Sequence, residues 1–187
     1  IQNATEPKIA EQIKKKLVQL TTIFLSEEAQ KKYHYGVSID DPALALDSFK
    51  AAQKLEKGNL ELLSKKSEAE LILGLCEDSE KTAKRALLFN PYSVTLSFRV
   101  GQSLICTRDF GAFQTWFQNA QGKELPKEYL SLLKAQSLFF SGEVGKSLAV
   151  LEEIRKSHDG FSEVWYWKAK AQKRSGFSPR EALSKYI

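Results

Sequence analysis

A spacing of 34 residues recurs along this chain of 187 residues. Three series of residues keep it: an alanine series that ends in isoleucine, a series of small residues and a series of branched apolar residues. These are Ala52, Ala86, Ala120 and Ile154; Ser67, Gly101, Ala135 and Ala169; and Leu62, Leu96, Leu130 and Val164. Because a fixed period of about 20 to 50 residues marks a repeat architecture, this recurrence constrains the fold more than any other feature.

Turn-forming residues divide each period into two segments. Asp41-Pro42, Asn90-Pro91 and Asp159-Gly160 are examples of these breakers, and Asp41 before Pro42 fits a helix N-cap followed by the first helical residue. Between the breakers, apolar residues return every three or four positions, and the alternation typical of strands is absent. The sequence therefore predicts an all-α fold of consecutive helix pairs.

The first 25 residues predict a separate amphipathic helix that packs on the repeats. Its apolar stripe consists of Ile9, Ile13, Leu17, Leu20 and Phe24. Residues 26–187 are then the repeat domain, and Ser26 is expected to cap its first helix. We expect the native polypeptide to begin before Ile1 and to continue past Ile187, since the chain has no initiator Met and its last predicted helix is short.

Composition excludes several classes of protein. An apolar content of 42% supports a core, and no apolar run approaches the roughly 18 residues that a membrane span needs. The net charge of +5 is spread along the chain, which argues against binding to nucleic acid. Cys76 and Cys106 are expected to fill small apolar spaces, with a disulfide between them as the alternative. Together with the absence of secretion features, unpaired cysteines favour a location in the cytoplasm.

The helix pairs resemble the tetratricopeptide repeat, whose signature is W-x2-L-G-x2-Y, then A-x3-F, then P. Segment 45–52 is similar to the second helix of such a repeat, and Val100-Gly101 with Leu104 matches the first half of the signature. Trp165 with Ala169 is a further match. About five units cover residues 26–187, the last of them incomplete. The resemblance implies a right-handed α-solenoid of stacked antiparallel helix pairs.

The resemblance also implies a concave groove lined by the first helix of each pair. It offers cations in the early units and apolar or aromatic side chains in the later ones, a combination that suits an extended or helical partner segment with acidic and large apolar residues. The expected groove residues are Lys31, Lys65, Arg99, Gln102, Leu133, Gln136, Tyr166, Trp167 and Lys170, with Phe139 beside them. A shift of one helical step would instead place Leu133 and Trp167 in the core.

No motif for catalysis or metal binding appears. The chain has only two histidines, neither in a spacing that suggests a catalytic dyad, and it has no glycine-rich phosphate loop or C-x2-C zinc spacing. The sequence thus predicts a non-catalytic scaffold or adaptor for proteins, with no cofactor, metal or small-molecule substrate. Two alternatives remain open: a helical repeat that binds nucleic acid, and a regulatory segment of a larger enzyme.

Overall fold

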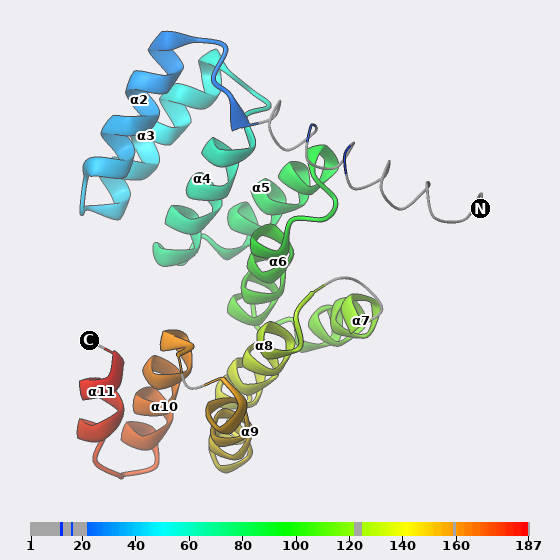
Figure 1. Cartoon of the computed structure of the whole chain (residues 1–187), viewed down its shortest axis with the longest axis vertical. Coiled ribbons are helices and arrows are strands. Elements are labelled where there is room, and N and C mark those ends of the chain that lie inside the picture. Colours follow the sequence, from blue (N-terminus) through cyan, green and yellow to red (C-terminus); the bar gives the residue numbers. More distant parts are fainter. Residues whose placement is uncertain (1–11, 13–15, 17–21, 122–124, 159, 187) are drawn as a thin grey trace. The chain divides into compact units, whose positions relative to one another are not determined.

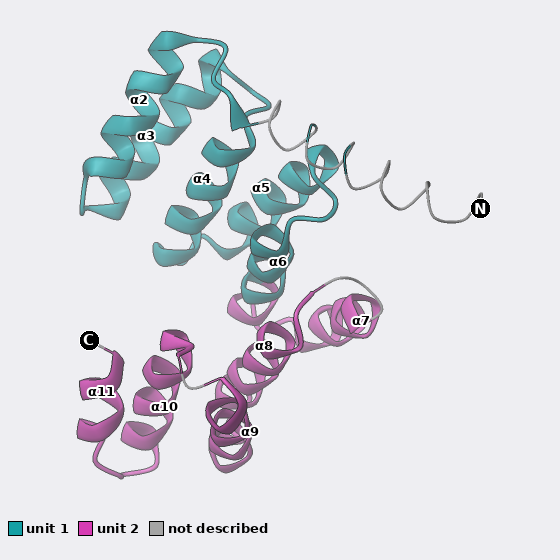
Figure 2. Cartoon of the chain, in the orientation of Figure 1, with its two compact units in different colours: residues 1–103 teal, residues 104–187 magenta. Residues whose placement is uncertain are grey.

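The computed structural model describes residues 12, 16, 22–121, 125–158 and 160–186 (Figure 1). Within these residues it contains helices and no strand, which confirms the all-α prediction. Two compact units make up the chain, residues 1–103 and residues 104–187 (Figure 2). The division falls inside helix α6 (Val94–Cys106).

Unit 1 is built from helix hairpins. Helix α2 packs against α3, α3 against α4, and α4 against α5, so that each helix covers the apolar face of its neighbour (Figure 1). The helices before α6 are α2 (Glu27–Ser38), α3 (Pro42–Leu55), α4 (Leu60–Ile72) and α5 (Cys76–Phe89).

Side-chain caps fix where the helices of unit 1 begin. The Asp41 carboxylate accepts hydrogen bonds from the backbone N–H groups of Ala43 and Leu44, at 2.8 and 3.3 Å, and Pro42 occupies the first turn. Ser26 caps α2 in the same way by accepting from the N–H of Ala29 at 3.2 Å. These bonds satisfy backbone donors that the first helical turn leaves free. Both predicted helix starts are therefore confirmed.

The α2–α3 hairpin depends on a close approach at Gly36. A Cβ atom at that position would lie 2.7 Å from Cε1 of the buried Phe49 ring and 3.2 Å from the carbonyl oxygen of Ala45. Phe49 also stacks on Tyr33, with ring centroids 5.9 Å apart. The core of this hairpin thus needs a residue without a side chain at Gly36.

Unit 2 continues with further hairpins. Helix α8 packs against α9, α9 against α10, and α10 against α11. After α6 the helices are α7 (Phe110–Gln121), α8 (Lys127–Phe140), α9 (Val144–Ser157), α10 (Ser162–Arg174) and α11 (Arg180–Tyr186).

The repeat is visible in hydrogen bonds that recur two periods apart. The Ser79 hydroxyl on α5 donates to the carbonyl oxygen of Ser67 on α4 at 2.8 Å. The Ser147 hydroxyl on α9 donates in the same way to the carbonyl oxygen of Ala135 on α8 at 2.7 Å. Small residues at these positions let the two helices of a pair approach until a hydroxyl reaches the neighbouring backbone. The 34-residue series in the sequence therefore corresponds to equivalent contacts in space.

Glycines in left-handed conformation end three of the first helices. The φ angles of Gly74, Gly142 and Gly176 are 74°, 92° and 79°. Each glycine N–H bonds back into the preceding helix, and so does the N–H of the residue that follows it. This is the Schellman arrangement, in which glycine takes the left-handed position because a Cβ atom is disfavoured there.

Most of the predicted helix over residues 1–25 lies outside the described residues. Phe24, the last member of its predicted apolar stripe, is described, and its ring packs against Tyr33 with a centroid distance of 5.0 Å. The Thr22 carbonyl oxygen accepts from the Asn59 amide at 3.2 Å, and the Leu25 N–H donates to Glu56 at 3.0 Å. Residues 23–25 are not helical, so the predicted helix does not extend to residue 25. Packing of the rest of this segment on the repeats stays a prediction.

Candidate partner-binding surface

The predicted groove cations of unit 1 are paired with carboxylates of the chain itself. Lys31 bonds to Glu27 at 2.7 Å, and Lys65 bonds to Glu68 at 3.0 Å. Arg99 lies 3.6 Å from Glu68 and donates to Gln102 at 3.0 Å. Its side chain is only 15% exposed, and this burial lowers the pKa of the guanidinium while Glu68 raises it. The positive charge in these positions is therefore largely compensated.

Three of the predicted groove residues in unit 2 are buried, and one of them is Phe139, which is 9% exposed. Leu133 is fully buried, and Gln136 is 2% exposed with its Nε2 atom buried and without a hydrogen-bond partner in the described part of the chain. The expectation that their side chains line the groove is wrong in this structure, because packing against neighbouring helices leaves them no surface. The alternative that Leu133 lies in the core is correct.

Trp167 behaves differently from Leu133, although it occupies the same position one period later. It remains partly exposed and packs edge-to-face on Phe139 and Phe140 of α8, with ring centroids 5.7 and 5.6 Å away. Tyr166, which is 36% exposed, adds a fourth ring at 5.7 Å from Trp167. We call these four rings, the buried Phe139 and the more exposed Phe140, Tyr166 and Trp167, the aromatic surface.

Three cations lie over the rings of the aromatic surface. The Lys170 ammonium is 4.6 Å from the centroid of Tyr166 and 4.8 Å from that of Trp167. The guanidinium carbon of Arg108 is 4.5 Å from the centroid of Phe140, and that of Arg174 is 5.0 Å from the centroid of Phe139. The electron-rich faces of aromatic rings attract cations at these distances.

None of these three cations has a carboxylate partner within the described ranges. The ion pairs of unit 2 involve other side chains: Glu128, Glu143, Lys146, Glu152, Arg155, His158 and Lys168. All three cationic side chains are exposed. The aromatic surface therefore carries positive charge that the described chain does not neutralise, unlike the cations of unit 1.

The sequence analysis missed Phe140, Arg108 and Arg174 as members of this surface. The repeat contains the signal that identifies Arg108, because this residue lies one period after Gly74 and one period before Gly142. Its φ angle of 63° is left-handed like theirs. Arg108 is thus an arginine in a glycine position, which a search for turn residues alone does not reveal.

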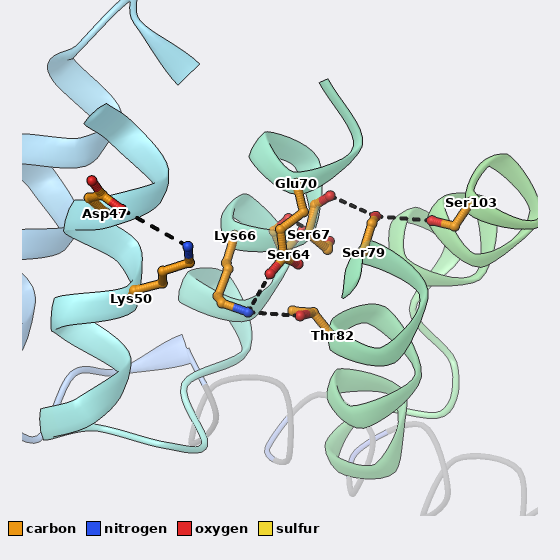
Figure 3. A network of polar contacts seen from close by, with 9 residues as sticks. All are labelled: Asp47, Lys50, Ser64, Lys66, Ser67, Glu70, Ser79, Thr82 and Ser103. Carbon is orange, nitrogen blue, oxygen red and sulfur yellow. Dashed lines mark hydrogen bonds and ion pairs between the residues drawn. The ribbon is translucent and has the colours of Figure 1, made fainter. Parts of the chain in front are cut away.

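A cluster of polar side chains lies between α4, α5 and α6 and holds these helices together (Figure 3). Lys66 binds Glu70 at 2.6 Å and Thr82 at 2.9 Å. The Ser103 hydroxyl donates to that of Ser79 at 2.9 Å. The bonds from Lys66 to Thr82, from Ser79 to the Ser67 carbonyl oxygen and from Ser103 to Ser79 connect neighbouring helices, whereas the bond from Lys66 to Glu70 lies within α4. We therefore assign it to hairpin packing rather than to ligand binding.

Neither metal ligation nor free thiols emerge from the described residues. No group of three or more His, Cys, Asp or Glu side chains is placed to hold a metal ion among them. Cys76 and Cys106 are both disulfide-bonded, so the expectation that they are unpaired space-filling residues is wrong. The support that unpaired cysteines gave to a cytoplasmic location is thereby removed.

A separate observation concerns membranes. In the described part of the chain, every helix is too short or too polar to cross a lipid bilayer.

Comparison with known proteins relates the chain to solved structures. No family model matches the sequence, and no curated protein matches it. TTC0263, a thermophilic tetratricopeptide-repeat protein of Thermus thermophilus, matches with a TM-score of 0.63 at 20% identity over 84% of this chain and 88% of its own.

Two other solved structures show the same likeness. A MamA chain from Desulfovibrio magneticus RS-1 matches with a TM-score of 0.56 at 14% identity, over 87% of this chain and 93% of its own. YrrB, described as a tetratricopeptide-repeat protein with an unusual peptide-binding site, matches with a TM-score of 0.51 at 14% identity, over 86% of both chains. With the recurring hairpins, these matches identify the fold: the chain has the α-solenoid fold of tetratricopeptide-repeat proteins.

Proposed function

We propose that the protein is an adaptor that holds a segment of a partner protein on the aromatic surface of unit 2. The observation that carries this proposal is the coincidence of three partly exposed rings, Phe140, Tyr166 and Trp167, with exposed cations that have no carboxylate partner within the described residues. Such a surface suits a segment with large apolar side chains next to acidic ones.

Large apolar residues would supply most of the affinity. Tyr166 and Trp167 each present ring surface whose burial by a partner removes apolar area from water. Aromatic residues and arginines dominate the energetics of protein interfaces, since they bury a large area for few rotatable bonds. Three partly exposed rings of the aromatic surface, with two arginines beside them, give the composition typical of an interface centre.

Acidic residues would supply specificity. In unit 1, Glu68 contacts both Lys65 and Arg99, so an acidic partner would have to compete with that carboxylate. In unit 2, Lys170 has ring contacts alone in the described structure. Opposite charges across an interface exclude wrong partners and accelerate association. This contrast supports an acidic contact in unit 2, whereas the sequence favours the early units.

The comparisons support a protein partner. YrrB is described as having a peptide-binding site, and the present chain shares its fold. The alternative of nucleic acid would call for a continuous stripe of cations, whereas the cations of unit 1 are paired with Glu27 and Glu68. A non-catalytic role and a location in the cytoplasm both stay predictions from the sequence.

Selection from a random peptide library with the full chain tests the proposal. Selected peptides are expected to combine aromatic or leucine residues with Asp or Glu. Calorimetry should then show that Lys170→Glu weakens binding by about tenfold or more, since a repulsive charge replaces an attractive one. Lys156→Glu, on an exposed lysine of α9, makes the same change of charge away from the rings and should leave affinity unchanged. Equal affinity for the wild type and Lys170→Glu would refute the proposed surface.

A further inference from the structure

We propose that Arg108 and Arg174 form a carboxylate-binding subsite at the aromatic surface, occupied by an Asp or Glu side chain of the partner segment. This inference rests on the proposed function and specifies which atoms of the chain recognise the acidic part of the partner.

Arg108 occupies a backbone position that favours glycine. The equivalent residues of the neighbouring periods, Gly74, Gly142 and Gly176, have positive φ angles, and Arg108 has a φ of 63°. Its N–H bonds to the carbonyl oxygen of Ile105 at 3.1 Å, as Gly74 bonds to Leu71. A residue with a Cβ atom is disfavoured in this conformation. Arg108 therefore adopts a backbone conformation that glycine adopts more readily. Its side chain is what distinguishes it from the glycines at the equivalent positions.

The Arg108 side chain is held in place by helix α8. Its Nη1 donates to the carbonyl oxygen of Phe140 at 2.7 Å, and the guanidinium stacks on the ring of the same residue. Arg174 repeats this arrangement one residue earlier. Its Nη1 donates to the carbonyl oxygen of Phe139 at 3.1 Å, and its guanidinium lies over the Phe139 ring. Two guanidinium groups are thus positioned on adjacent residues at the end of α8.

Both guanidinium groups keep donors available. Each has five N–H donors and uses one on a backbone carbonyl group. Stacking on a ring fixes the plane of the guanidinium, so less freedom is lost when an anion binds. The planar fork matches the two oxygens of a carboxylate, which is why arginine is common where carboxylates are recognised. The end of α8 therefore offers two oriented forks beside the apolar rings.

A carboxylate is the occupant that these observations favour. Each guanidinium lies over one aromatic ring, Phe140 or Phe139, which suits a carboxylate that follows or precedes a large apolar residue in the same peptide. In the described residues, neither arginine has an acidic side chain that would compete. A phosphorylated residue presents similar oxygens, so the experiment includes it as a separate arm.

A double-mutant cycle tests the subsite with a peptide taken from the library selection. The first change is Arg108→Gly, which restores the residue found at the equivalent turns and keeps the fold. The second change replaces each Asp or Glu of the peptide in turn by its amide. For one acidic position, the two changes should be coupled by about tenfold in affinity. The affinity of the wild type should also fall more steeply with sodium chloride than that of Arg108→Gly.

Two other outcomes of these measurements would contradict the proposed subsite. Additive effects at every acidic position would overturn the subsite. Binding that requires phosphoserine in place of the acidic residue would overturn carboxylate recognition. Arg108→Gly should retain a peptide affinity that Lys170→Glu lowers further, so loss of the subsite and failure of the whole aromatic surface are distinguished. Lys156→Glu again serves as the control for charge.

Discussion

The Arg108 guanidinium donates to the carbonyl oxygen of Phe140 at 2.7 Å while lying over the ring of the same residue. One side chain thus satisfies a carbonyl group at the end of α8 and covers its last aromatic ring. This relationship links the turn after α6 to the aromatic surface, and it accompanies the only positive φ angle of a non-glycine residue in the described chain.

Replacing Arg108 by glycine should change the free energy of unfolding by no more than about 1 kcal/mol. Relief of the left-handed strain, about 1 kcal/mol, offsets the loss of an exposed hydrogen bond and a cation–π contact of similar total size. Urea unfolding followed by circular dichroism measures the difference. Gly142→Ala is the control: it meets no atom within 4 Å but has a φ of 92°, and should cost about 1–2 kcal/mol. A loss above about 2 kcal/mol for Arg108→Gly would mean that the arginine mainly stabilises the fold.

Gly36→Ala should destabilise the protein by about 1–3 kcal/mol. The new Cβ would lie 2.7 Å from the buried Phe49 ring, so the α2–α3 hairpin must separate or Phe49 must leave its rotamer. Gly145→Ala makes the same change at an exposed position of helix α9, where no atom lies within 4 Å. It should instead stabilise the protein by about 0.5–1 kcal/mol, since alanine favours the helix. Thermal unfolding of both variants would reveal the opposite signs, and equal signs would contradict the close approach.

Glu152 should make stability depend on acidic pH. Hydrogen bonds from Lys168 and then Arg155 lower the pKa of this carboxyl below its ordinary value of 4.5. A lowered pKa in the folded state contributes stability that is complete above about pH 4.5 and is lost as the pH falls through the folded value. Glu152→Gln should therefore lower the free energy of unfolding by about 1 kcal/mol at pH 7 and leave it unchanged at low pH. The expected effect is small because the side chain is 36% exposed and solvent weakens its ion pairs. Glu153→Gln is the matched control, and urea titrations at several pH values would test the window.

Leu133→Ala should cost about 2–5 kcal/mol of unfolding free energy, as expected for a fully buried leucine. Tyr166→Ala should cost about 1 kcal/mol, because its ring is 36% exposed. Peptide affinity should change in the reverse order, falling strongly for Tyr166→Ala and little for Leu133→Ala at temperatures where both are folded. An affinity loss for Leu133→Ala as large as that for Tyr166→Ala would contradict the assignment of Leu133 to the core.

The recurrence of small residues was sufficient to predict the helix pairs. Ser67 stands in the series of small residues, and its carbonyl oxygen accepts a hydrogen bond from the Ser79 hydroxyl on the other helix of the pair. Asp41 and Ser26 were recognisable as caps, since capping depends on residues within three positions along the chain. Such features are local, so a single sequence contains them.

The sequence did not predict which residues far apart along the chain contact each other. Arg99 was predicted to be a groove cation, and the structure places it against Glu68, which lies on a different helix. Arg108 and Phe140 are 32 residues apart. Contacts of this kind depend on how far each helix is shifted and rotated against its neighbour, which the period does not specify.

By itself the sequence determined the helix pairs, their 34-residue period and the starts of α2 and α3. Tertiary packing decided which equivalent positions face solvent. Leu133 and Trp167 are one period apart, yet Leu133 is fully buried whereas Trp167 stays partly exposed on Phe139 and Phe140. The period sets the direction of a side chain around its helix, but burial depends on the size of that side chain and on the residues that neighbouring helices bring against it.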